Sequence, residues 1–177
     1  MKSFSFGQPS ADVPVAIAPG YFKSIEPGKF ALAGHPAGGC FGTVDDMLRL
    51  LNFIVQGGTW HGRTLIKPEP LKEMLTVQYS TEIAKAVADG KPSAYEPWGL
   101  GWLVRGTDPK YAGYWFGFGD SKSPTLFGHA GVDTIFGDGD PARELAFVFN
   151  MTNRLRDAAE STRVRREVSN RLQDAVI

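Results

Sequence analysis

The sequence lacks the features that mark several large classes of protein. It has one cysteine, Cys40, which excludes an internal disulfide. No apolar run approaches the roughly 18 residues of a membrane-spanning helix, and the N-terminal residues hold no apolar stretch long enough for a secretory signal. Acidic and basic residues balance at 19 each, so no charge pattern indicates nucleic acid. We therefore expect neither nucleic acid nor a membrane as a partner, and the chain as it stands is expected in the cytoplasm.

Several motifs of catalysis and cofactor binding are also missing. G-x-S-x-G, S-x-x-K, Y-x-N and S-x-N occur nowhere in the sequence. The three histidines lie far apart and Cys40 has no second thiol near it, so no metal site is expected. The glycine-rich AGGCFG has neither the dinucleotide-binding nor the P-loop spacing, and we interpret it as a flexible lead into a helix. No cofactor is expected.

The chain has the length of a single domain, 1–177, with three successive parts. Residues 1–38 form a loop-rich opening in which prolines recur too often for a helix of normal length. Residues 39–95 form a helical segment, and residues 96–177 form an antiparallel sheet plus a C-terminal helix. The pattern therefore predicts an α+β architecture.

Helical spacing is strongest after Thr43, which begins a sequence similar to a capping box with Asp46. The apolar residues that follow predict a helix ending at Gly57-Gly58. Pro68 suits the first position of a second helix, although Lys67 is a poor N-cap. A further short helix is expected around Glu82–Ala88. At the C-terminus, an i, i+4 repeat predicts an amphipathic helix that covers one sheet face; its members are Val164, Val168, Leu172 and Val176.

Four runs rich in aromatic and β-branched residues predict the strands: WGLGWLVRG, YAGYWFGF, PTLFGHAGVDTIFG and ELAFVFNMTN. The segment DGDPAR between the last two predicts a turn, which makes them an antiparallel hairpin. The final run is apolar on both faces, so both faces are expected to be covered.

One histidine and one serine are the candidate catalytic side chains. His129 lies in LFGHAG, between Gly128 and Gly131, on a run expected to be a strand. Glycines inside a strand often mark the close approach of a ligand or another backbone, and a half-exposed structural histidine is the alternative. Ser121 stands in GDSKSP, which joins a hydrolase-like turn to a polar loop.

The segments AGGCFGTVDDMLRLLNFIVQGGTWHGRTLIKPEPLKEMLTVQ, WGLGWLV, FGHAG and GDPARELAFVFNMTN, in this order, resemble the serine hydrolases related to class C β-lactamases. This group includes family VIII-type esterases, penicillin-binding-protein-like D-alanyl-D-alanine carboxypeptidases and D-aminopeptidases. The resemblance runs from about residue 1 to the C-terminus. The opening MKSFSFG resembles an internal segment of the family, and its members are often periplasmic or secreted. The resemblance implies an incomplete β-lactamase/transpeptidase-like fold.

In that family three motifs meet at the active site: S-x-x-K, a Tyr or Ser motif, and K-T-G or H-x-G on an edge strand. HAG at 129–131 matches the third. The resemblance implies that His129 faces the cleft, that Gly128, Ala130 and Gly131 contact substrate, and that the backbone N–H of Val132 helps to form an oxyanion hole. The first two motifs are absent from this sequence.

Three hypotheses for function follow. In the first, the chain is the C-terminal portion of a hydrolase of esters or amides, inactive alone because the serine and lysine are missing. It would self-associate or pair with an N-terminal half, and accept substrate only when complemented. In the second, it is a non-catalytic module that binds a ligand or protein. In the third, it is a self-sufficient esterase with Ser121 as nucleophile and His129 as base.

Overall fold

The computed structural model has helices and antiparallel strands and confirms the α+β architecture. Its short opening elements are β1 (Ser5–Phe6) and β2 (Cys40–Phe41), which pair with each other. The structure describes residues 3–7, 34–35, 39–90, 96–106, 119–120, 123–131, 135–151, 155 and 157–176.

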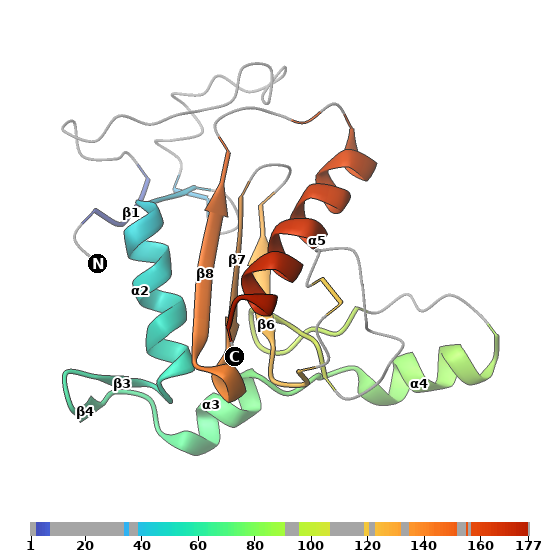
Figure 1. The fold of residues 1–177 in the computed structure, drawn as a ribbon. Coiled ribbons are helices and arrows are strands. Elements are labelled where there is room, and N and C mark those ends of the chain that lie inside the picture. Colours follow the sequence, from blue (N-terminus) through green and yellow to red (C-terminus); the bar gives the residue numbers. More distant parts are fainter. Residues whose placement is uncertain are drawn as a thin grey trace.

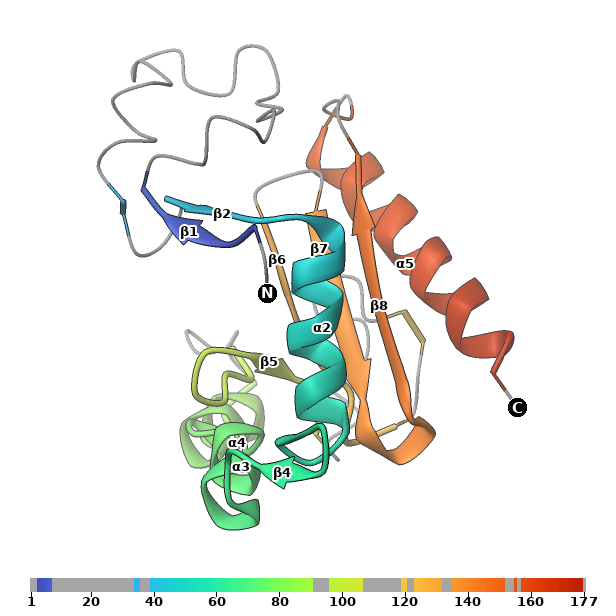
Figure 2. The same cartoon turned by 90° about the vertical axis from the view of Figure 1, so that its left-hand side faces the viewer.

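A four-stranded antiparallel sheet forms the centre of the molecule, in the order β5-β6-β7-β8. Figures 1 and 2 show helices α2 and α5 on opposite sides of these strands. The expectation that both faces of the last strand are covered is therefore confirmed. The bounds are β5 (Leu103–Val104), β6 (Phe127–Ala130), β7 (Ile135–Asp140), β8 (Leu145–Asn150), α2 (Val44–Val55) and α5 (Ala158–Asp174).

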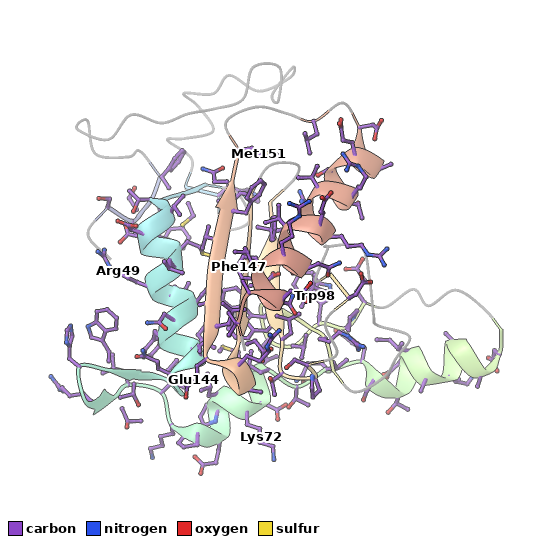
Figure 3. The ribbon with its side chains drawn as sticks, viewed as in Figure 1. Arg49, Lys72, Trp98, Glu144, Phe147 and Met151 are labelled. Atoms are coloured by element: carbon purple, nitrogen blue, oxygen red, sulfur yellow. The ribbon has the colours of Figure 1, made fainter. Side chains whose placement is uncertain are left out.

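Helix α2 begins and ends where the sequence predicts. The Thr43 side chain accepts a hydrogen bond from the Asp46 N–H at 3.1 Å, which satisfies one of the free donors of the first turn. Asp46 itself is buried and accepts from the Ser3 N–H, so it ties the N-terminal segment to the helix. Gly57 and the next glycine end the helix with positive φ. Figure 3 shows Arg49 on the side of α2 that faces away from the sheet.

The layer between α2 and the sheet is apolar and closely packed. Leu51 and Ile54 of α2 are buried against Phe127 of β6. Two glycines of β7 permit this approach: a Cβ on Gly137 would lie 2.8 Å from the Leu51 side chain, and one on Gly139 would lie 2.5 Å from the Phe127 ring. The missing side chains therefore let the helix lie directly on the strand.

Smaller elements connect α2 to the sheet. They are the ladder of β3 (Thr59–Trp60) with β4 (Arg63–Thr64), then α3 (Pro68–Met74) and α4 (Ser80–Ala88). Pro68 is the first residue of α3, and Lys67 makes no side-chain capping bond, as the sequence predicts. Helix α4 confirms the short helix expected around Glu82–Ala88.

The structure corrects two of the predicted strand boundaries. The run PTLFGHAGVDTIFG, predicted as one strand, forms β6 and then β7, which pair with each other. The DGD of the predicted turn belongs to β7, and the turn is the short 3₁₀ helix η2 (Pro141–Arg143). The Asp140 carboxylate remains buried because it accepts bonds from Ser123, Thr125 and the Ala142 N–H. The β7–β8 hairpin itself is confirmed, and YAGYWFGF lies outside the described residues.

The C-terminal helix is present, but a different stripe faces the sheet. Val168 packs against the core, whereas Leu172 is 38% exposed. The most deeply buried positions of α5 are polar and recur at i, i+4; they are Ser161, Arg165, Ser169 and Gln173. The predicted apolar stripe was therefore wrong about which side chains contact the sheet. The sheet face beneath α5 carries the buried carboxyl group of Asp138, which requires polar neighbours.

Within the described residues, no helix is both long enough and apolar enough to span a membrane.

The packing of α2 predicts a sharp contrast between two leucines of the same helix. Leu51 has no exposed surface and Leu48 is 37% exposed. Leu51→Ala is expected to lower the free energy of unfolding by about 2–5 kcal/mol, because it leaves a cavity against the sheet. Leu48→Ala, the matched control, is expected to stay within about 0.5 kcal/mol of the wild type. Urea unfolding followed by circular dichroism measures both, and equal losses would contradict this packing.

Candidate active-site segment

His129 is the exposed residue of an otherwise buried strand. In β6, Phe127, Gly128 and Ala130 are buried and His129 is exposed. Alternation along the strand places His129 on the same face as Phe127, the face that α2 covers. Helix α2 packs mainly on β7 and β8, however. The face therefore stays more open over β6, where the imidazole lies.

An aromatic neighbour limits the hydration of His129. The Trp98 ring lies 5.4 Å from the imidazole, centroid to centroid, at a tilt of 53°. Partial burial lowers the pKa of His129 below its ordinary value, and a backbone hydrogen bond with Ala130 acts in the opposite direction. The imidazole is therefore neutral at pH 7, the form that accepts a proton or a hydrogen bond.

The glycine after HA is explained by the hairpin itself. The Gly131 N–H donates to the Ile135 carbonyl at 2.8 Å, and a Cβ on Gly131 would lie 2.6 Å from the Ile135 side chain. The next strand therefore makes a close approach to Gly131. Gly128 and Ala130 are buried and Gly131 is half-buried. Of the predicted site side chains in this strand, His129 alone is exposed.

The two other predicted catalytic residues, Ser121 and Val132, lie outside the described residues. The residue before Ser121 is described. The Asp120 carboxylate accepts bonds from Arg166 and Asn170 of α5, and its N–H donates to Asn170 at 2.6 Å. These contacts fix Asp120 beside α5.

A buried polar network joins α5 to the end of β6, and the sequence did not reveal it. Arg165, which is 7% exposed, donates from Nη2 to the Gly131 carbonyl at 3.0 Å. Asp138 of β7 is buried beneath α5 and has a hydrogen bond with Ser169 and a charge interaction with Arg165. The signal available in the sequence is the polar i, i+4 repeat of α5.

Burial dominates the electrostatics of Asp138. Loss of hydration raises the pKa of its carboxyl well above the ordinary value, while the Ser169 hydrogen bond and the Arg165 charge pull the pKa down by less. Among the described residues, its Oδ2 atom has no hydrogen-bond partner. The buried carboxyl therefore lies beside the arginine that contacts Gly131.

Comparison with known proteins places these features in a family. The sequence matches the Beta-lactamase family over residues 1–170. A comparison with curated protein sequences gives no match.

Two solved structures share the fold. A penicillin-binding protein homologue from Caulobacter crescentus is 20% identical, with a TM-score of 0.51 over 74% of this chain and 32% of that one. A beta-lactamase from Mycobacterium bovis is also 20% identical, with a TM-score of 0.55 over 78% of this chain and 46% of that one. The chain thus spans less than half the length of either protein.

The contact of Trp98 with His129 gives a direct prediction. Trp98→Ala removes the ring that shields the imidazole from water, so the pKa of His129 is expected to rise toward the ordinary value of about 6.5. Titration of the imidazole proton signals by nuclear magnetic resonance (NMR) measures this pKa. Trp60→Ala is the control, since Trp60 contacts His61 instead. An unchanged pKa in a folded Trp98→Ala variant would show that other atoms cause the lowering.

Asp138→Asn is expected to change how stability depends on pH. The folded-state pKa is raised, so the folded protein keeps a proton that the unfolded chain releases above about pH 4. As the pH rises above the pKa that Asp138 has in the unfolded chain, the wild type therefore loses free energy of unfolding. The asparagine variant has no carboxyl to titrate and does not lose it. Urea unfolding at several pH values should show Asp138→Asn gaining stability relative to the wild type as the pH rises above about 4.

The control for that measurement is Asp120→Asn, for which the opposite sign is expected. The Arg166 hydrogen bond, followed by that of Asn170, lowers the pKa of Asp120. The contribution of Asp120 to stability is fully present above the ordinary pKa of an aspartate and is lost as the pH falls through its lowered folded-state pKa. Parallel profiles for the wild type and Asp138→Asn would refute the raised pKa.

Proposed function

Because the chain belongs to the beta-lactamase family, we propose that it is the C-terminal part of a serine hydrolase. The full enzyme cleaves esters or amides through an acyl-enzyme, in which a serine oxygen first displaces the alcohol or amine and water then releases the acid. This part supplies one wall of the cleft. The missing wall supplies the serine and the lysine.

The observation that carries the proposal is the HAG segment at the end of β6. His129 is exposed while its strand neighbours are buried, and α2 packs mainly on the other two strands of that face. A neutral imidazole in this position accepts or relays a proton beside the bound substrate. The N–H of Val132, one residue beyond HAG, is assigned to the oxyanion that forms on the substrate carbonyl.

The chain alone is expected to be inactive. S-x-x-K is absent from its sequence, so the nucleophile that forms the acyl-enzyme is missing. Removal of a catalytic serine costs about a million-fold in kcat in well-studied serine hydrolases. A cleft wall without its nucleophile therefore binds substrate at most.

The partner that best fits is an N-terminal segment bearing S-x-x-K and Y-x-N. The two solved relatives are more than twice as long as the part that this chain matches. Among the described residues, β8 pairs on one side only, with β7. Apolar side chains are also exposed around the start of α2: Phe4, Phe6, Val44 and Leu48. An added strand on β8 and a packed segment over these side chains would complete the sheet and cover the apolar surface.

The first experiment compares the chain alone with the chain complemented. The coding DNA upstream of Met1 is expected to contain an in-frame S-x-x-K segment, which sequencing tests. Co-expression of that segment with this chain should give hydrolysis of p-nitrophenyl esters or a chromogenic cephalosporin, and the chain alone should give none. In the complemented enzyme, His129→Ala should lower kcat by about 100-fold or more, whereas His61→Ala, on the distant β3–β4 turn, should not change it.

The outcomes separate the alternatives. A folded but inactive complex would contradict the proposal, and binding of an acyl or peptide ligand without turnover would favour a non-catalytic module. Hydrolysis by the isolated chain, with fluorophosphonate labelling that Ser121→Ala abolishes, would favour a self-sufficient esterase instead. A chain that forms only homodimers and ignores the upstream segment would favour self-association.

A further inference from the structure

We propose that Arg165 is a positioning residue that sets the orientation of the peptide group between Gly131 and Val132. This peptide carries the N–H that the proposed function assigns to the oxyanion hole, and the catalytic meaning of Arg165 rests on that proposed function. The structural part of the proposal, the hydrogen bond from α5 to the Gly131 carbonyl, stands on contacts of the described residues alone.

The contact that carries the proposal comes from the buried side of α5. Arg165 Nη2 donates to the Gly131 carbonyl oxygen at 3.0 Å, and its side chain is almost completely buried. On its other side, Gly131 donates its N–H to Ile135 at 2.8 Å. Both polar groups of Gly131 are thus held, one by β7 and one by the helix.

Covalent geometry extends this control to the next residue. The Gly131 carbonyl and the Val132 N–H belong to one peptide group, which is planar, and in a trans peptide they point in opposite directions. A donor that fixes the Gly131 carbonyl therefore also restricts the direction that the N–H of the same peptide group can take.

The charge of Arg165 strengthens the effect. A hydrogen bond from a guanidinium is charge-assisted, and in a buried setting it polarises its acceptor more strongly than a neutral donor does. Polarisation of the carbonyl draws electrons from the amide nitrogen of the same group, which makes its N–H a better donor. The same bond thus both orients and activates the peptide.

The surroundings of Arg165 explain why the guanidinium stays in place. Asp138 lies under α5 and interacts with its charge, and Ser169, one turn further along α5, has a hydrogen bond with that carboxyl. The stripe continues to Gln173, whose amide donates to the Ser169 hydroxyl at 2.7 Å. Arg143 then donates to the carbonyls of Gln173 and Val176 at the end of the helix. These contacts fix the position of α5 along its own axis, and with it the position of Arg165.

The chain supplies a matched control on the same helix. Arg163 is two residues away, is exposed, and binds Glu167 on the outer surface at 3.3 Å. Loss of either arginine removes one positive charge from α5. Loss of Arg165 alone removes the donor to Gly131.

The test uses the isotope-labelled 177-residue chain and follows two NMR signals, the Gly131 carbonyl carbon and the Val132 amide. Arg165→Met is expected to move both signals, because the carbonyl loses its charged donor, while Arg163→Met leaves them in place. A general loss of packing would instead move signals throughout β6 and β7. Unchanged Gly131 and Val132 signals in a folded Arg165→Met variant would overturn the proposal.

A second pair of variants decides the matter if Arg165→Met fails to fold, which circular dichroism would show. Arg165→Lys keeps the charge but replaces the planar fork of donors by a single ammonium, so the two signals should still move, by a smaller amount. Arg163→Lys should move neither. No difference between the two lysine variants would overturn the proposal.

The catalytic part is tested in the complemented enzyme. Arg165→Met should lower kcat on the order of tenfold with little change in KM, less than the loss of about 100- to 1000-fold that follows removal of an oxyanion donor. Arg165→Lys should recover part of kcat. A rise in KM with kcat unchanged would contradict the assignment. If the complemented enzyme has no activity, the proposed function fails, and the NMR comparison still decides whether Arg165 controls the peptide.

Discussion

The carboxyl group of Asp138 is buried in β7, and its need for polar neighbours determines how α5 lies on the sheet. A buried polar group without hydrogen bonds costs about 1–3 kcal/mol or more, so a purely apolar helix face would leave the carboxyl uncompensated. Ser169 and Arg165 compensate it. Helix α5 therefore turns its polar stripe inward, and this rotation brings Arg165 to the Gly131 carbonyl. The burial of Asp138 thus leads to the hydrogen bond between Arg165 and Gly131 at the end of β6.

The two faces of the sheet are built on different physical principles. The α2 face is held by apolar burial and by glycines that let the helix approach the strands. The α5 face combines an apolar cluster around Phe136 and Phe147 with the polar network of Asp138, Arg165 and Ser169. Dispersion and hydrophobic burial tolerate small shifts, whereas hydrogen bonds require fixed distances and directions. The network on the α5 face is accordingly the part that defines the position of the β6 end.

The two faces of the sheet contribute differently to the proposed site. Arg165 of α5 binds the Gly131 carbonyl on one face, and His129 is exposed on the opposite face of β6. Preorganised donors of this kind need no rearrangement when charge develops on a substrate. In the proposed enzyme this chain would form one wall of the cleft, and the proposed N-terminal segment would add the nucleophile.

The sequence by itself determined the elements whose signals are local. The cap at Thr43, the glycines after α2 and Pro68 at the start of α3 each act within a few residues, so the pattern predicted them correctly. Only the tertiary structure decided which stripe of α5 is buried, because that choice depends on Asp138, a residue of another strand that the pattern assigned to a turn. It also decided that Gly131 is required by Ile135, and that Arg165 contacts Gly131 across 34 residues. Such contacts join segments that lie far apart in the sequence, so the local periodicity of one segment does not reveal which residue it contacts.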